Sequence, residues 1–390
     1  MILTQCAVCA TDLGLSLGKK CGRCSTRYCG PDCQVQHWER GGHEALCRRI
    51  RRAGGAEQYH ADIKCNEAVA VAVEACADDT RGQTCYICME AVHSRTGEGL
   101  VRGCACGDRD GVASGRTGIA HVSCLAEQAK ILNDEAEENN LALKGRWDRW
   151  HTCSLCEQDY HGVVFCALSW ACWKTYLGRP ETDWPRGAAM MLLGIGLGDA
   201  GRFEEALSVQ EAELAMRRRA GASAGRILDV QANLAVSYHN LGRLEEASSM
   251  QRDVYSGQLK LNGEENRGTL MAANNYAISL THLKRYAEAK SLLHKMIPVA
   301  RRVLDESSEI TLKMRWKYAE ALCRDTAATL DDVREAVTTL EDTERTARRV
   351  FGASHPTTTG HEESLRDARA ALAARDVEAL GDALGALGAA

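Results

Sequence analysis

The second half of the chain repeats one pattern of apolar and polar positions. The segments NLAVSYHNLGRLEEA (233–247) and NYAISLTHLKRYAEA (275–289) align 42 residues apart, and an earlier copy ends at Ala206. A small residue recurs at one place in successive copies: Ala235, Ala277 and Ala319. Small residues at fixed positions, a short turn and a second amphipathic segment are typical of helix-turn-helix units that stack into a solenoid. We therefore predict helical repeats over residues 187–375.

Two further helices are predicted upstream. Residues 56–77 read as an amphipathic connecting helix, on which Cys65 and Cys76 are about three turns apart and share the apolar face. Residues 161–178, HGVVFCALSWACWKTYLG, are apolar nearly throughout and predict a buried helix before the first repeat. We expect the cysteines of both segments to be small core residues rather than metal ligands.

Composition narrows the function classes. The chain has 390 residues, enough for two or three domains, and a net charge of −5, which does not favour nucleic-acid binding. No run of eighteen apolar residues or secretory signal is evident, so we expect no membrane association and a cytoplasmic protein. The basic run RRIRR (48–52) could direct nuclear import, although such runs are more often the solvated flank of a helix.

Cysteine usage divides the chain. Sixteen of the nineteen cysteines precede residue 157, and only Cys323 lies in the last two hundred residues. An odd number of cysteines without a secretory signal argues against a disulfide framework, because the cytosol keeps thiols reduced. Clustered thiols in a reducing compartment indicate metal binding in the N-terminal half.

The first cluster offers eight soft or imidazole ligands: Cys6, Cys9, Cys21, Cys24, Cys29, Cys33, His43 and Cys47. Eight ligands make two closed tetrahedral zinc sites, and a C-x-x-C pair lets both sulfurs face one ion from a tight turn. A 47-residue segment with few large apolar residues has little core, so the metal would supply its folding energy. We expect His37 to be a surface helix residue.

These residues resemble the MYND-type zinc finger, including Tyr28 before Cys29 and the sequence that runs on to Cys47. The resemblance implies one ion on Cys6, Cys9, Cys29 and Cys33, and another on Cys21, Cys24, His43 and Cys47. Such fingers bind proteins, often proline-rich peptides, and the matching groove residues here are Gln34 and Trp38. Packing against the zinc knuckles is the alternative role for both. No lysine-methyltransferase motif accompanies the finger.

A second series of eight ligands follows: Cys85, Cys88, Cys104, Cys106, His121, Cys124, Cys153 and Cys156. A redox C-x-x-C pair would stand alone, whereas Cys153 and Cys156 close a series and so predict a metal site. The order resembles a RING-CH finger, which implies Cys85, Cys88, His121 and Cys124 on one zinc. Cys104, Cys106, Cys153 and Cys156 would hold the other. We therefore expect four structural Zn²⁺ ions in all, none with an open coordination position.

The RING-CH resemblance implies a ubiquitin ligase that recruits a ubiquitin-conjugating enzyme. Ile87 matches the apolar contact inside the first C-x-x-C, and Trp147 or Trp150 could add an aromatic contact, with core packing as the alternative. Three features depart from the pattern: a long Gly-rich loop before His121, an acidic helix after Cys124, and Glu157, where active ligases often carry a basic residue. Enzyme activity is therefore left open.

The repeats resemble tetratricopeptide repeats, and their 42-residue period is similar to the kinesin-light-chain subtype. Such arrays bind extended peptides along the first helix of each unit. Asn233, Asn275 and Lys317 share one repeat position and are candidate peptide contacts. Alternatively, the asparagines bond neighbouring helices.

The sequence therefore predicts a mainly α fold, with two cross-brace zinc fingers followed by an α-solenoid. The expected bounds are 1–52 for the MYND finger, 53–80 for a helical linker, 81–162 for the RING-CH finger, 163–186 for a connector, 187–375 for the repeats and 376–390 for a tail. The leading hypothesis is a zinc-binding adaptor with ubiquitin-ligase activity that selects targets through the MYND finger and the repeats. The alternative is a non-catalytic interaction scaffold.

Overall fold

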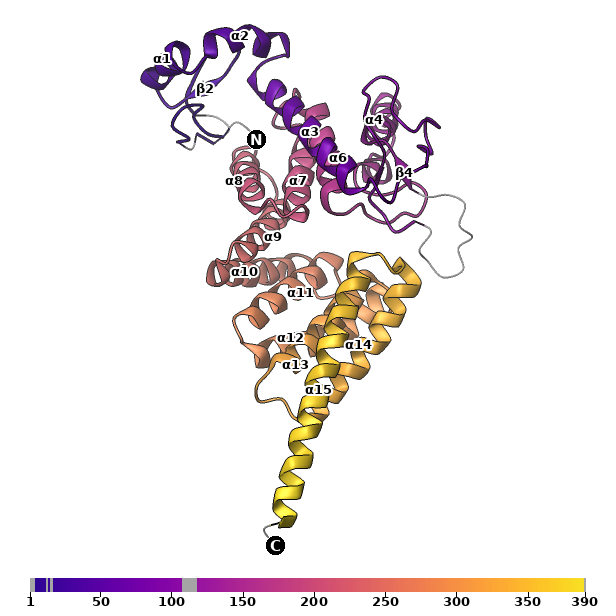
Figure 1. The fold of residues 1–390 in the computed structure, drawn as a ribbon. Coiled ribbons are helices and arrows are strands. Elements are labelled where there is room, and N and C mark those ends of the chain that lie inside the picture. Colours follow the sequence, from indigo (N-terminus) through magenta and orange to yellow (C-terminus); the bar gives the residue numbers. More distant parts are fainter. Residues whose placement is uncertain (1–3, 12, 15–16, 107–117, 389–390) are drawn as a thin grey trace. The chain divides into compact units, whose positions relative to one another are not determined.

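The computed structural model describes residues 4–11, 13–14, 17–106 and 118–388 (Figure 1). It is mainly helical, and a repeat solenoid follows a zinc-finger region, so the predicted fold class is confirmed. The chain divides into two compact units, Met1–Cys104 with Arg116–Ser237, and Ala105–Gly115 with Tyr238–Ala390. Within the described ranges, no helix is both long and apolar enough to cross a membrane.

The N-terminal finger is built from a two-stranded ribbon and two short helices. Its elements are β1 (Lys19–Lys20), β2 (Arg27–Tyr28), α1 (Pro31–Glu39) and α2 (His43–Arg52), and the strands pair antiparallel. Pro31 opens α1, where a missing N–H is tolerated. Tyr28 and Ile50 join the cysteines in a small core. Because that core holds few large apolar side chains, the cysteines occupy much of its interior.

The second cysteine-rich region lies among helices of the first unit. Its elements are α3 (Ala56–Ala75), β3 (Val101–Arg102), β4 (Ile119–Ala120), α4 (Val122–Glu138), α5 (Lys144–Trp147) and a 3₁₀ turn (Asp148–Trp150). The two strands pair antiparallel, with Val101 opposite Ala120. The Gly-rich loop noted in the sequence falls largely on residues 107–117, outside the described residues.

One apolar helix, α6 (Gly162–Tyr176), holds the first unit together. It packs against α3, α4 and α7 (Trp184–Asp199), and most of its side chains are buried. A Cβ at Gly196 of α7 would lie 2.4 Å from the Ser169 hydroxyl, so the close approach of these two helices requires glycine. Cys166 and Cys172 are buried here, as the apolar pattern predicted.

The suggestion that Trp147 or Trp150 forms an exposed aromatic contact is wrong. Trp147 is 5% exposed and Trp150 is fully buried. Their rings meet Tyr176 at centroid distances of 5.1 and 5.8 Å, and Trp147 also meets Trp184 at 4.8 Å. Aromatic rings bury large apolar areas, and Trp147 at the end of α5 and Trp150 in the following 3₁₀ turn both contact Tyr176 of α6. Core packing therefore accounts for both residues.

The repeats are helix pairs joined by short turns. After α7 follow α8 (Phe203–Arg219), α9 (Ala224–Asn240), α10 (Leu244–Asn262), α11 (Arg267–His282), α12 (Tyr286–Leu304), α13 (Glu309–Arg324), α14 (Leu330–Phe351) and α15 (Pro356–Gly388). The recurrent alanines are fully buried: Ala235, Ala277 and Ala319. A side chain of this size lets helices approach closely, which explains why the sequence repeats it.

The turns within three of these pairs share one backbone conformation. Gly201, Gly242 and Lys284 have φ values of 74°, 78° and 60°, in the left-handed region. Glycine adopts this conformation without a Cβ penalty, whereas lysine does not. The third turn is therefore strained at Lys284.

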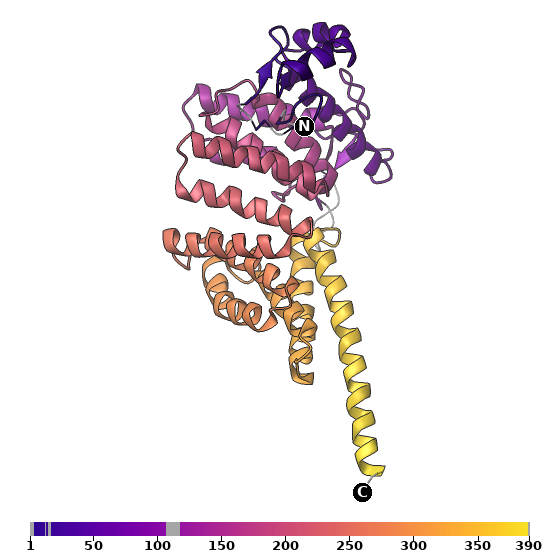
Figure 2. The same cartoon turned by 90° about the vertical axis from the view of Figure 1, so that its left-hand side faces the viewer.

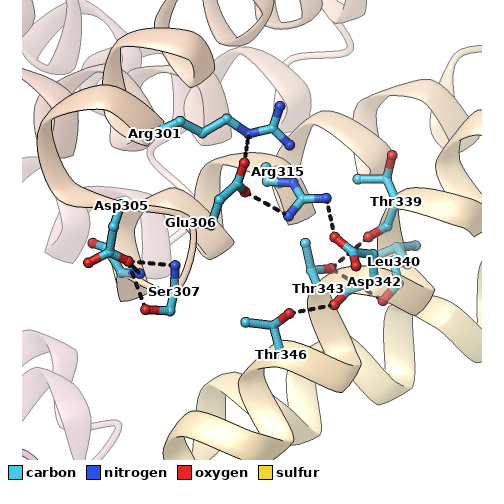
Figure 3. Close-up of polar contacts among 11 residues, drawn as sticks. Arg301, Asp305, Glu306, Ser307, Arg315, Thr339, Leu340, Asp342, Thr343 and Thr346 are labelled. Atoms are coloured by element: carbon cyan, nitrogen blue, oxygen red, sulfur yellow. Dashed lines mark hydrogen bonds and ion pairs between the residues drawn. The ribbon is translucent and has the colours of Figure 1, made fainter.

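A polar network fixes the loop between α12 and α13 to α14 (Figure 3). Arg315 of α13, only 8% exposed, lies 3.4 Å from Glu306 of the loop and 2.7 Å from Asp342 of α14. Arg301 of α12 contacts Glu306 at 2.9 Å. Asp305 accepts hydrogen bonds from the backbone and hydroxyl of Ser307 at 2.6 and 2.7 Å. The carboxylates of Glu306 and Asp342 thus neutralise a buried guanidinium and join three successive helices.

Candidate metal centres and interaction surfaces

The structure brings all sixteen candidate ligands together in four groups. They are Cys6, Cys9, Cys29 and Cys33; Cys21, Cys24, His43 and Cys47; Cys85, Cys88, His121 and Cys124; and Cys104, Cys106, Cys153 and Cys156. Within each group the ligand atoms lie within 4.8 Å of one another. These are the interleaved groupings that the two resemblances implied.

Each C-x-x-C pair forms the same local turn. The residue after each second cysteine has a left-handed φ, between 56° and 64°: Ala10, Ser25, Met89 and Glu157. In all four turns the first cysteine N–H donates to the carbonyl five residues on, at 2.8 to 3.0 Å. At Cys85 and Cys153, a backbone N–H two residues on also points at the sulfur, at 3.4 and 3.5 Å. Such N–H groups stabilise a thiolate, so the backbone is arranged for charged sulfur ligands.

Distances within the groups match a tetrahedral ion. A zinc ion about 2.3 Å from sulfur and 2.0 Å from nitrogen separates its ligands by about 3.8 Å between sulfurs and 3.6 Å between sulfur and nitrogen. Sulfur–sulfur separations of 3.5 and 3.9 Å occur for Cys9–Cys29 and Cys21–Cys47. Cys24 Sγ lies 3.4 Å from His43 Nε2, and Cys88 Sγ lies 3.3 Å from His121 Nδ1. A disulfide would need about 2.05 Å, and all nineteen cysteines are free.

The pKa values of the clustered cysteines and histidines also favour the binding of a cation. The hydroxyl of Thr11 helps to lower the pKa of the Cys9 thiol to about 6, whereas the neighbouring Cys29 helps to raise the pKa of Cys33 to about 12. Four crowded thiols therefore cannot all ionise unless a positive ion offsets their repulsion. Burial lowers the pKa values of His43 and His121, which keeps both imidazoles neutral, the form that binds metals.

These features indicate zinc binding by closed, structural sites. Each group supplies four cysteine or histidine ligands, the donor set that zinc takes when no position is left for water or substrate. Cys65 and Cys76 belong to none of the groups; Cys65 is buried on α3, Cys76 is buried directly after its last residue, and burial raises the pKa of the Cys65 thiol to about 11. They are core residues, as the spacing on the helix suggested.

The MYND candidates lie on one face of α1. Gln34 and Trp38 are four residues apart and half-buried, and the Trp38 ring meets His43 at 5.8 Å, edge to face. A hollow of about 330 Å³ lies beside Gln36 and Arg40, on the opposite side of the helix. Trp38 therefore packs partly against the metal group, and its peptide-binding role stays a prediction.

Ile87 lies in a second hollow, of about 380 Å³, between the first C-x-x-C turn and α4. Ile131 and Leu132 of α4 form its apolar wall, and Ile131 is 46% exposed. Arg95 and Glu127 stand at its edge. Pattern reading pointed to Ile87 alone. The spacing of Ile131 and Leu132 after Cys124 could have identified the α4 wall.

The three candidate peptide contacts of the repeats are each half-buried. Asn233 lies on α9, Asn275 on α11 and Lys317 on α13. Lys317 is held by Glu320 at 2.8 Å and lies 3.8 Å from the centre of the Trp316 ring. Sequence reasoning missed the nearby pair His239 and His282, whose rings lie 4.3 Å apart edge to face. These two histidines are offset by one residue from the 42-residue repeat, which hid them.

Comparison with known families identifies two of the modules. Residues 6–47 match the MYND finger model, and residues 227–267 and 269–308 match a tetratricopeptide repeat model. No curated protein shows significant sequence similarity to the chain.

Several solved structures are similar to the repeats. One is a protein from Podosopora anserina described as a putative kinesin light chain with nearly identical TPR-like repeats, at 17% identity, 59% coverage of this chain, 97% of that chain and a TM-score of 0.37. A second structure of that protein, with one residue substituted, gives the same identity and coverage and a TM-score of 0.38. Another is BtubC (BKLC) from P. vanneervenii, at 11% identity, 65% and 91% coverage and a TM-score of 0.34. The two family-model matches show that the chain combines a MYND zinc finger with tetratricopeptide repeats.

Proposed function

We propose that the protein is a cytoplasmic adaptor with RING-CH-type ubiquitin-ligase activity. Zinc fingers of the MYND kind and tetratricopeptide repeats generally mediate protein–protein contacts, and the chain carries both. The ligase part of the proposal assigns residues 81–162 to a RING-CH finger. Four structural zinc ions would hold the two fingers in shape.

The observation that carries the proposal is the hollow at Ile87. A docking site for a folded partner needs an exposed apolar contact on a rigid support, and Ile87 is fixed by a metal-binding turn. Ile131 and Leu132 extend that contact along α4. The Tyr86 hydroxyl lies 3.0 Å from the Ser154 hydroxyl, which ties the first and last C-x-x-C turns of the region together. The partner would be a ubiquitin-conjugating enzyme.

The mechanism is catalysis by positioning. The cysteine and histidine groups would hold zinc as a structural ion without a reactive position, and Ile87 lies between two of those ligands, Cys85 and Cys88. Ile87, Ile131 and Leu132 hold the conjugating enzyme so that its ubiquitin thioester faces a lysine of the target, which converts a bimolecular encounter into an oriented one. The target would bind the MYND face of Gln34 and Trp38, or the repeats at Asn233, Asn275 and Lys317.

A non-catalytic scaffold is the second candidate, and Glu157 favours it. This residue follows the last ligand, is exposed, and has a φ of 60°. A carboxylate there would repel rather than hold an acidic partner surface, so docking at Ile87 would not be followed by transfer. Under the ligase proposal, Glu157→Arg should increase the rate of ubiquitin transfer.

The deciding experiment compares wild type with Ile87→Ala in ubiquitin-chain formation. The protein is incubated with activating enzyme, a panel of conjugating enzymes, ubiquitin and ATP. Burying an isoleucine side chain contributes roughly 1.5–3 kcal/mol, so its loss should weaken docking about ten- to a hundredfold. Val92→Ala is the matched control, because Val92 is 58% exposed and lies outside the hollow.

Both variants must retain the zinc content of the wild type. Chains that form with wild type and with Val92→Ala but not with Ile87→Ala support the ligase proposal. Absence of chains with every conjugating enzyme refutes it and leaves the scaffold. Equal activity of all three proteins would refute docking at Ile87.

A further inference from the structure

A long groove lies between α3 and α4, with α6 as its floor. Its volume is about 730 Å³, in the range typical of ligand sites, about 300–1,000 Å³. Both walls pack against α6, and apolar side chains form part of the lining: Val69, Val73, Ala126 and Ala171. Neither the metal groups nor the repeats account for this groove.

The groove has the length of a short helix. Along α3 it runs from Cys65 to Glu74, and along α4 from Val122 to Lys130. At 1.5 Å per residue these walls are about 14 and 12 Å long. Two helical walls over a helical floor form the surface on which an amphipathic helix packs its apolar face.

The two ends of the groove differ in charge. Lys130 and Lys174 stand at one end, where they contact Asp134 at 2.6 Å and Asp62 at 3.1 Å, and Glu127 lies one helical turn before Lys130. An ammonium group has three donors, so each lysine can bind a second carboxylate.

The other end carries both signs of charge, from Glu74, Arg95 and Glu98. Glu98 is already bonded to the Ser123 backbone at 2.7 Å and to its hydroxyl at 2.5 Å. A helix with acidic residues near one end would therefore be oriented by the two lysines.

The sequence itself contains such a segment. Residues 376–390, DVEALGDALGALGAA, include Asp376, Glu378 and Asp382 in their first half and no lysine or arginine. Asp376 already lies 3.3 Å from Arg334 of α14, so Glu378 and Asp382 are the acids left for the groove. Larger apolar residues recur there at intervals of three, four and three: Val377, Leu380, Leu384 and Leu387. These intervals are those of one helical face, and ten residues of helix span about 15 Å, close to the length of the groove.

The backbone of residues 376–388 is helical. Helix α15 continues to Gly388, and its last turns extend beyond α14 in both views (Figures 1 and 2). Val377 is 68% exposed, which is unusual for a residue of its size in the repeats. Residues 376–388 therefore form a helix with an apolar pattern and an acidic start, matching the groove in length and charge.

We infer that residues 376–390 of one chain bind the α3–α4 groove of a second copy. The acidic start of the segment lies at Lys130 and Lys174, and the leucines lie along the apolar lining. Since groove and segment are different surfaces of the chain, the contact is head-to-tail. It produces closed rings or open chains rather than a two-fold dimer.

The first test is the mass of the full chain in solution, measured by light scattering over roughly 1 to 100 µM. Mass should rise with concentration for wild type and stay at the monomer value for Leu384→Asp. A wild-type protein that is monomeric throughout this range overturns the inference. So does a Leu384→Asp variant that associates as wild type does.

The second test uses a fluorescent synthetic peptide of residues 374–390 and the Leu384→Asp chain, whose own segment no longer competes. Ala70 is an exposed groove residue of α3, and Ala70→Glu should weaken peptide binding at least about tenfold. Ala75→Glu places the same charge on the same helix outside the groove, and should change binding by less than about twofold. Equal binding by the two variants, or no peptide binding at all, overturns the inference. Zinc content and circular dichroism establish that each variant is folded.

Discussion

The first prediction concerns Glu213, a carboxylate buried inside the first unit. Glu213 of α8 is fully buried, and Arg217 contacts it at 2.7 Å while also donating to the Gly187 carbonyl at 3.1 Å. Burial raises the pKa of Glu213 from 4.5 to about 7, an effect that Arg217 only partly offsets and that the charge of Asp229 increases. Folding therefore favours the protonated acid.

The direction in which pH changes the stability of the fold follows from proton binding by Glu213. Between pH 4.5 and 7 the folded chain holds the proton of Glu213 while the unfolded chain releases it, so stability falls as pH rises through this interval. From about pH 5 to 7 the loss is about 1.5 pKa units, or about 2 kcal/mol. Glu213→Gln cannot titrate. The difference in unfolding free energy between the variant and wild type should thus shift by about 2 kcal/mol in favour of the variant over this interval.

Urea unfolding followed by tryptophan fluorescence measures this difference. Six of the seven tryptophans lie in the first unit, so the signal reports its unfolding. Glu213→Gln leaves Arg217 without a carboxylate, and any loss of unfolding free energy from this is the same at every pH. It therefore does not change the pH dependence of the difference between the variant and wild type. Zinc content is checked at each pH. Parallel wild-type and variant curves would refute the reasoning.

Three further outcomes are expected. Lys284→Gly should stabilise the repeats by about 1 kcal/mol in urea unfolding, because glycine relieves the left-handed turn; a loss of stability would contradict this. Thr311 is fully buried with no hydrogen-bond partner for its hydroxyl, so Thr311→Val should be neutral or stabilising by about 1 kcal/mol in thermal melts, and a drop would reveal a hidden partner. A zinc chelator should unfold residues 1–160 and leave the repeats helical by circular dichroism, since no described residue of the repeats belongs to a metal group; loss of all helicity would refute this.

Much of the fold followed from local pattern. The 42-residue recurrence of alanine and the Gly-Arg and Lys-Arg turns predicted the helix pairs. Alanine recurs because it lets two helices pack closely, and the turns recur because each contains one residue with a left-handed backbone conformation. The local spacing of the cysteines and histidines predicted metal ligands, whereas their interleaved grouping followed only from the MYND and RING-CH resemblances. Domain bounds, the number of zinc ions and the roles of Gln34 and Trp38 stay predictions.

What the sequence could not supply is long-range packing. Trp147 and Trp150 precede a ligand pair and looked available for contact, yet their burial depends on Tyr176 and Trp184, which follow later in the chain. The α3–α4 groove likewise exists only because both helices pack on α6. The burial of Glu213, by contrast, could have been predicted from the sequence. Glu213 lies seven residues after Ala206 and three before Met216, both of which are buried, so it occupies a position of the helix where an apolar residue is expected.

The central claim is that sixteen side chains form four structural zinc sites that support the interaction surfaces. Native mass spectrometry with elemental analysis of the purified full chain tests it most directly. We expect four zinc ions per chain, and three in a Cys153→Ala variant, which removes a ligand from one group only. Two or fewer zinc ions in the folded wild-type protein would contradict it.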